Sequence, residues 1–221
     1  MSEEVLIPKM KRIDKTKRKF KIPVLNFVVV LFCTLLLISS TFLNLCIKHY
    51  ILPLDLFSNR NLTIEDFIYC ICFIPQVPTV MFVCSSLGKR MALTSVILYI
   101  TAGLGFIPVF ALGGGFRYFF EYGFGYILAY IPAVVICGNL LGKKYSFLNM
   151  IKAVLAGVLT IHILGIIYMT IVALFKHAGT TFIAGWIEAQ SGLKIIYDLI
   201  ISFVLVLIGK YIHSVLKFII E

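Results

Sequence analysis

The chain has 221 residues, of which 61% are hydrophobic and only 14% are charged, and its mean hydropathy is +1.03. This composition leaves too little polar surface for a water-soluble globule and indicates an integral membrane protein. The formal net charge of +10 excludes an acidic surface and suits contact with anionic lipid headgroups.

Residues 1–22 form a basic tail, and this tail runs directly into an apolar segment. We interpret the tail as a topology determinant that contacts lipid, and not as a nucleic-acid arm. The apolar segment is too long for the hydrophobic region of a signal peptide, and no small-residue cleavage pattern follows it. We therefore expect a retained first helix.

Six apolar segments follow along the chain. A helix of about 20 residues crosses a hydrocarbon core of roughly 30 Å, and no period-two alternation of the barrel kind is present. The sequence predicts an all-α integral membrane protein in which residues 23–210 form one domain and residues 211–221 a short cytoplasmic tail. The six predicted transmembrane helices lie near residues 23–47, 67–87, 91–112, 124–141, 151–175 and 195–208.

The distribution of basic residues predicts the orientation. With a cytoplasmic N-terminus, the eight Lys and Arg residues of the tail and seven others lie inside, which accounts for 15 of the 20. Cytoplasmic segments accumulate such residues, so both termini are predicted to be cytoplasmic. The basic residues left outside are Lys48, Arg60, Arg117, Lys176 and Lys194.

Several polar or unusual residues fall within the apolar segments. Pro75 and Pro78 lie inside the second predicted helix, where we expect a kink that shapes a cavity. His162 needs a partner inside the bundle, and it is either a packing residue or a ligand contact. The cysteines are interpreted as small core residues and not as metal ligands: Cys33, Cys46, Cys70, Cys72, Cys84 and Cys137.

Catalytic motifs are absent from the sequence. The string nearest to a nucleotide-binding loop, GNLLGKK at 138–144, has the wrong spacing and no hydroxyl residue after the lysine. There is no HExxH pair, no GxSxG elbow and no acidic cluster on one helix face. We therefore predict no enzyme activity, no catalytic or metal site and no cofactor.

Residues 108–132 predict a binding loop on the outer side. Glycines let the backbone approach a ligand closely, aromatic rings offer flat apolar walls, and Arg117 offers a fork for a carboxylate. This combination suits a small, partly apolar acid. The candidate residues of the loop are Gly113, Gly114, Gly115, Arg117, Tyr118, Glu121, Tyr122 and Tyr126.

Asp198 is predicted to lie about one turn into the sixth helix from the outer side. Burying its charge costs about 2.5–3.5 kcal/mol on insertion scales, so it should face the interior. It either pairs with Lys194, four residues earlier, or binds a ligand. Trp186, in the outer loop before this helix, is either an interfacial anchor or a lid residue.

Several segments resemble the BioY family, the biotin-specific S components of energy-coupling-factor vitamin transporters. The matching strings are IPQVPTVMFV at 74–83, SSLGKRMALTSVILYITAGLGFIPVFALGGG at 85–115 and YGFGYILAYIPAVVICG at 122–138, with weaker echoes at 161–169 and 197–200. The family's Gly-Asp-Leu-x-Lys signature appears as residues 197–201, where Asp198 is kept and the lysine is lost. Arg117 or Lys194 is the candidate to replace that cation.

The resemblance implies a six-helix substrate-binding subunit of the bacterial plasma membrane that takes up biotin from outside. Its implied partners are a transmembrane T component and two ABC-type ATPases, besides membrane lipid, and no nucleic acid. We assign Arg117 to the biotin carboxylate, Asp198 to the ureido group, and Tyr118, Tyr122 and Tyr126 to the walls or polar tips. Small residues on the first helix commonly mediate docking, but only Ser40 and Asn44 have that spacing here.

Three alternatives remain open at this point. Another vitamin-sized carboxylic acid fits glycines, aromatic rings and one cation equally well. A non-catalytic membrane scaffold would make the Arg117 loop incidental. A small membrane enzyme acting on lipid would need a nucleophile or metal ligands that the sequence does not offer.

Overall fold

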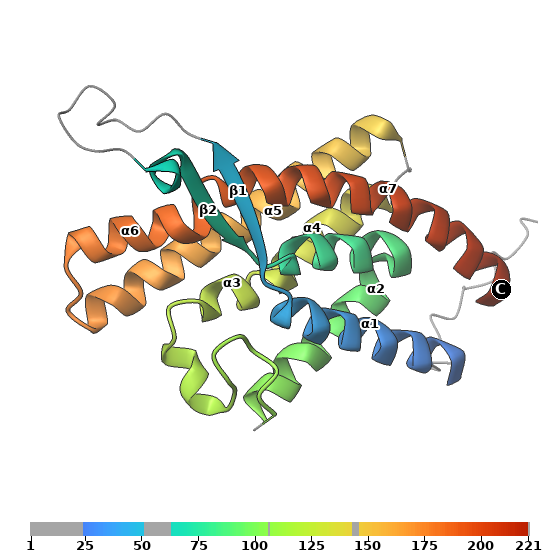
Figure 1. Cartoon of the computed structure of the whole chain (residues 1–221). Coiled ribbons are helices and arrows are strands. Elements are labelled where there is room, and N and C mark those ends of the chain that lie inside the picture. Colours follow the sequence, from blue (N-terminus) through green and yellow to red (C-terminus); the bar gives the residue numbers. More distant parts are fainter. Residues whose placement is uncertain (1–23, 51–62, 106, 143–145, 221) are drawn as a thin grey trace, which may run out of the picture.

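The structure is a computed structural model that describes residues 24–50, 63–105, 107–142 and 146–220 (Figure 1). The basic tail predicted for residues 1–22 lies outside the described residues. The elements in chain order are α1 (Val24–Phe42), β1 (Leu45–Tyr50), η1 (Ile64–Phe67), β2 (Ile68–Phe73), α2 (Gln76–Leu104), η2 (Phe116–Phe120), α3 (Phe124–Leu128), α4 (Tyr130–Leu141), α5 (Phe147–Phe175), α6 (Thr180–Ser191) and α7 (Lys194–Ile220).

Five helical segments of the described residues are long and apolar enough to cross a membrane. They are Val24–Phe42, Gln76–Leu104, Phe124–Leu141, Phe147–Phe175 and Thr180–Leu216. The predicted class, a helical membrane protein, is confirmed at this level. The last helix continues to Ile220, so most of the tail predicted for residues 211–221 is helical.

The long α2 is folded back on itself at Gly88. This residue has φ 75° and ψ 169°, a backbone conformation that essentially only glycine adopts without strain. Gln76 Nε2 donates a hydrogen bond of 2.6 Å to the Tyr99 hydroxyl. In a straight helix, 23 residues would separate these two positions by roughly 35 Å along the axis. The two halves of α2 are therefore antiparallel, and they correspond to the second and third predicted helices.

A two-stranded antiparallel sheet occupies the region between α1 and α2, where the sequence predicted helix ends and a loop. Strands β1 and β2 pair with Cys46 opposite Cys72. The predictions that the first helix extends to Ile47 and that the second begins at Phe67 are wrong. The strings LCIKHY and IYCICF are short and rich in β-branched and aromatic residues, which favours strands.

Two further predictions about this region are corrected. Pro75 is the N-cap of α2 and Pro78 lies in its first turn, so neither kinks the helix. The backbone N–H groups of the first turn have no helical partner in any case, so proline removes no helical hydrogen bond there. Cys46 and Cys70 are exposed and form a disulfide between the strands, and they are not core residues. Cys72 is free and exposed, whereas Cys33, Cys84 and Cys137 are buried as expected.

Close helix contacts fix the part of the bundle that carries the polar side chains. A Cβ at Gly165 of α5 would lie 2.5 Å from the Tyr126 ring, and one at Gly125 of α3 would lie 2.3 Å from Tyr168 Cβ. These two glycines let α3 and α5 approach until each receives an aromatic residue of the other. Tyr126 is thereby held against α5 at Gly165.

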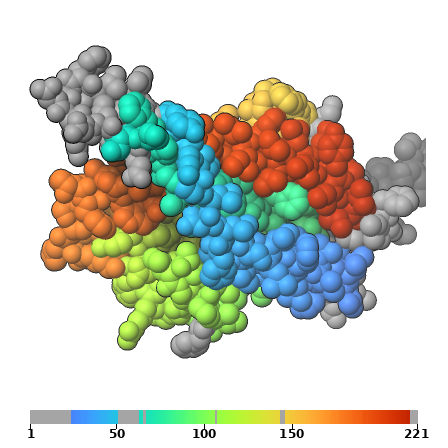
Figure 2. Space-filling view, in the orientation of Figure 1, coloured from blue at the N-terminus to red at the C-terminus, as the bar shows by residue number. Residues whose placement is uncertain are grey.

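The irregular segments gather at one end of the bundle. In Figure 1 the strand pair, the η2 loop and α6 lie toward the left, whereas the end of α7 lies at the far right. In Figure 2 the strands (cyan and teal) lie over the region where α6 (orange) meets α7 (red). Tyr197 of α7 contacts both His49 of β1 and Phe73 of β2 there.

Gly88→Ala is expected to lower the free energy of unfolding by about 1–3 kcal/mol, because alanine at this φ is strained. Thermal unfolding of the purified protein in detergent measures the change. Gly185→Ala is the matched control, since Gly185 lies inside α6 with open space around it. The control should be neutral or gain up to about 1 kcal/mol, and equal melting temperatures for both variants would refute a hairpin that depends on Gly88.

Candidate ligand-binding site

A cavity of about 290 Å³ lies between the start of α2, the η2 loop, α3, α5, α6 and the start of α7. It therefore opens at the end of the bundle where the irregular segments gather. A volume near the lower limit of ligand pockets, roughly 300 Å³, suits a small molecule. Its lining residues are Phe73, Ile74, Gln76, Val77, Ala111, Leu112, Tyr118, Gly123, Tyr126, Ile127, Tyr130, His162, Trp186, Gln190, Lys194 and Asp198.

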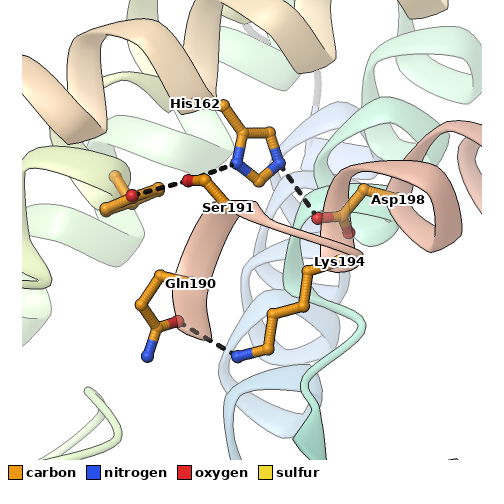
Figure 3. Close-up of polar contacts among 6 residues, drawn as sticks. His162, Gln190, Ser191, Lys194 and Asp198 are labelled. Atoms are coloured by element: carbon orange, nitrogen blue, oxygen red, sulfur yellow. Dashed lines mark hydrogen bonds and ion pairs between the residues drawn. The ribbon is translucent and has the colours of Figure 1, made fainter. Parts of the chain in front are cut away.

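A chain of polar contacts crosses one wall of this cavity (Figure 3). His162 Nε2 lies 3.1 Å from Asp198 Oδ2, and His162 Nδ1 lies 2.9 Å from Ser191 Oγ. Ser191 Oγ in turn lies 2.7 Å from the Tyr126 hydroxyl. An ionised carboxylate only accepts hydrogen bonds, so with a neutral imidazole Nε2–H donates to Asp198 and Nδ1 accepts from Ser191. In this series of contacts each donor, from Tyr126 through Ser191 to His162, therefore points toward Asp198.

Asp198 keeps one oxygen free for a ligand. Its side chain is buried, and Oδ1 has no hydrogen-bond partner among the described residues. A buried carboxylate oxygen without a donor costs about 1–3 kcal/mol or more. This oxygen is itself buried, so a ligand N–H in the cavity would reach it once the carboxylate turns toward the cavity.

Lys194 brings a cation to the same cavity, but its hydrogen bond goes elsewhere. Lys194 Nζ donates to Gln190 Oε1 at 3.1 Å (Figure 3). Among the described residues, the ion-pair partner of Asp198 is His162. Of the two alternatives for Asp198, a direct pair with Lys194 is thus not formed, and the ammonium group remains able to turn toward an anion.

Aromatic rings form the wall contributed by α6. Trp186 lines the cavity, with its ring centroid 6.0 Å from that of Tyr126 and 6.1 Å from that of Tyr122. Tyr122 also packs against Phe182, and Lys176 Nζ lies 4.5 Å from the centre of the Tyr122 ring. Trp186 is therefore a residue of the cavity wall, which favours its interpretation as a lid residue.

The opposite wall carries a fixed carboxamide. Gln76 Nε2 donates to Thr41 Oγ1 at 2.9 Å and to the Tyr99 hydroxyl at 2.6 Å. These two bonds use Nε2, so the carboxamide oxygen is the acceptor that Gln76 can offer to a ligand. Tyr130 lines the cavity close by and is 2% exposed.

The structure brings together only some of the candidate residues from the sequence. Tyr118, Tyr126 and Asp198 line the cavity, and Tyr122 supports Trp186. Arg117 is exposed on η2, and neither it nor Glu121 is among the lining residues. Burial raises the pKa of the Tyr118 phenol, which therefore stays neutral near pH 7. The ligand roles assigned to all these residues stay predictions.

The three glycines of the loop shape its turn. Gly113 and Gly115 have φ of 115° and 89°, where other residues are strained. A Cβ at Gly114 would lie 2.5 Å from the carbonyl oxygen of Ile107. They are not among the lining residues, whereas Ala111 and Leu112 just before them are. The glycines thus let the loop bring its neighbours to the cavity.

Sequence reasoning did not assign Gln76, Tyr130 or Gln190 to the site. Gln76 could have been proposed from the sequence, because an uncharged polar side chain in an apolar segment needs hydrogen-bond partners inside the bundle. Tyr130 and Gln190 could not have been proposed, since their position at the cavity depends on how the helices pack. Among the described residues, no group of three or more His, Cys, Asp and Glu side chains is arranged to hold a metal ion.

Comparisons with known proteins agree with this architecture. A model of the BioY family matches residues 61–218. The structure is also similar to the crystal structure of the S-component for biotin from an ECF-type ABC transporter. The TM-score is 0.62 at 21% sequence identity, and the match covers 86% of this chain and 92% of the other. At this identity the likeness shows the fold. No curated protein matches the sequence.

Trp186 is the single tryptophan of the chain, and it lines the cavity. A ligand that enters the cavity is therefore expected to change the tryptophan fluorescence of the protein in a saturable way. Titration in detergent measures this change. Trp186→Phe should abolish the signal while the protein still binds, and a saturable signal in that variant would show that the fluorescence reports something other than Trp186.

Proposed function

Since this chain belongs to the BioY family, we propose that it is a substrate-binding membrane subunit that captures biotin from outside the cell. The observation that supports biotin most directly is the pairing, in one cavity, of a free buried carboxylate oxygen with a cation and aromatic walls. Biotin needs all three: acceptors for two ureido N–H groups, a cation for its carboxylate, and apolar surfaces for its ring and chain.

The free acceptors suit the ureido group. Asp198 Oδ1 lacks a donor among the described residues, Gln76 Oε1 is a second acceptor, and both side chains line the cavity. Asp198 is held in place by His162, and Gln76 by Thr41 and Tyr99. Two fixed acceptors recognise a flat group with two N–H donors at little cost in side-chain entropy.

Lys194 is the better placed of the two candidate cations for the carboxylate. It lines the cavity at the first residue of α7, one helical turn from Asp198. Arg117 would have to reach the carboxylate from the exposed face of the η2 loop. We therefore propose Lys194 for the carboxylate and keep Arg117 as the alternative. Trp186, Tyr118 and Tyr126 would surround the apolar part of the ligand, with Tyr122 behind Trp186.

The proposed arrangement in the membrane has six crossings, with each half of α2 counted as one. Both termini would be cytoplasmic, in keeping with the basic residues of the tail, and the cavity would face outward. The chain contains no nucleotide-binding motif, so uptake against a gradient would use a separate module with a T component and ABC-type ATPases. The membrane would be the bacterial plasma membrane.

Binding of labelled biotin to the purified chain in detergent tests this function, with unlabelled biotin, thiamine and lipoate as competitors. Saturable binding displaced by biotin alone is expected. Displacement by lipoate or thiamine would favour another vitamin-sized ligand. Correctly folded protein without any saturable ligand would favour a membrane scaffold.

Lys194→Met is expected to weaken biotin binding by about 10- to 100-fold, because a charge-assisted hydrogen bond contributes roughly 1.5–3 kcal/mol. Arg117→Met should change it less than threefold. Lys48→Met is the matched control, since Lys48 is an exposed cation on β1 that does not line the cavity. The equilibrium Kd of each variant is the measurement, and a larger loss in Arg117→Met than in Lys194→Met would reverse the assignment.

Asp198→Asn is expected to weaken binding at least tenfold, because the amide removes the charge and presents one oxygen where the carboxylate has two. Ser202→Ala serves as the control: Ser202 lies one turn deeper in α7, is buried, and its hydroxyl has no partner among the described residues. It should bind biotin normally. Normal binding by Asp198→Asn would mean that Asp198 serves only to pair with His162.

A further inference from the structure

A second hollow of about 650 Å³ adjoins the ligand cavity, and we refer to it as the vestibule. One side is formed by strand β2 and the other by the end of α6 and the start of α7. Its lining residues are Tyr69, Cys70, Ile71, Cys72, Glu188, Ala189, Gln190, Gly192, Leu193 and Lys194. The ligand-binding residues proposed above leave most of this space unused.

The vestibule and the cavity meet at two side chains. Gln190 and Lys194 line both spaces, and the hydrogen bond between them lies on the common boundary. Asp198 lies four residues beyond Lys194 on α7, about 6 Å farther along the helix axis, and it lines only the cavity. A ligand held by Asp198 at one end and by Lys194 at the other would therefore have its second end at the boundary with the vestibule.

The vestibule offers groups of both charges to whatever extends into it. Glu188 is an exposed carboxylate at its edge, and Lys194 supplies an ammonium group. Ile71 and Leu193 add apolar surface between the polar groups. A flexible alkyl chain that ends in an ammonium and a carboxylate matches this lining better than a purely apolar or purely anionic group does.

We infer that the chain accepts not only free biotin but also biotin amides, in which the carboxyl group is joined to the amino group of an amino acid, as in ε-N-biotinyl-lysine. This inference rests on the proposed function. The amide carbonyl would accept from Lys194 or Gln190 at the boundary, and the alkyl chain would run into the vestibule. There the α-ammonium group would pair with Glu188.

Competition against labelled biotin tests the inference, with unlabelled biotin and ε-N-biotinyl-lysine as the two competitors. The amide is expected to displace biotin with a Kd within about tenfold of that of biotin. Failure of a 100-fold excess of the amide, in a preparation where unlabelled biotin displaces normally, would overturn the inference and leave the proposed function intact. Absence of biotin binding itself would overturn both.

A vestibule-filling variant separates the two ligands. Ala189 is exposed and lines the vestibule but not the cavity, so Ala189→Trp should weaken binding of the amide more than tenfold and that of biotin less than twofold. Ala184→Trp makes the same change at an exposed position of α6 that lines neither space, and it should affect neither ligand. Equal effects of Ala189→Trp on both ligands would overturn the inference.

Cys72 provides a direct readout of occupancy. It is the exposed one among the free cysteines of the described residues, and it lines the vestibule. ε-N-Biotinyl-lysine should slow its modification by a bulky maleimide severalfold, whereas biotin should slow it little. Cys72→Ser verifies the labelled site. Equal protection by the two ligands, or none by the amide, would show that the amide does not enter the vestibule.

Discussion

The buried carboxylate of Asp198 is the constraint on which the cavity end of this molecule depends. A charge at this depth is tolerated only if the surrounding helices supply donors. His162 of α5 does so directly, and Ser191 and Tyr126 hold His162 in turn. The carboxylate therefore ties α3, α5, α6 and α7 to one geometry, while its second oxygen has no partner among the described residues.

The helices could be predicted from the sequence because runs of apolar residues long enough to cross a bilayer admit few other structures. The strands could not be predicted. A six-residue apolar string such as IYCICF is too short to distinguish a strand from part of a helix, so the sequence analysis included it in the predicted helix that follows. The reversal at Gly88 could be predicted, because Gly88, Lys89 and Arg90 interrupt two apolar runs and separate the second predicted helix from the third.

Those site residues could be predicted whose chemical character stands out against their own sequence context. Asp198 stood out because an intramembrane charge needs a partner, and Tyr118 and Tyr126 because they flank a glycine-rich turn. Gln76, Tyr130 and Gln190 depend on which helix faces meet, which no local pattern records. The family match extends over residues 61–218 and so includes every residue that lines the cavity. Of the two candidate cations named from the sequence, Lys194 lines the cavity and Arg117 does not.

The hydrogen bond from Gln76 to Thr41 joins the cavity wall to α1, a helix whose other side is bare. Val28, Phe32 and Leu35 of α1 are exposed apolar residues, so this is a surface that lipid or another membrane subunit covers. A shift of α1 by a few ångström would break the bond to Thr41 and leave the carboxamide held by Tyr99 alone. If Gln76 contacts the ligand as proposed, occupancy of the cavity and the position of α1 would be thermodynamically linked, and each would change the other by the same free energy.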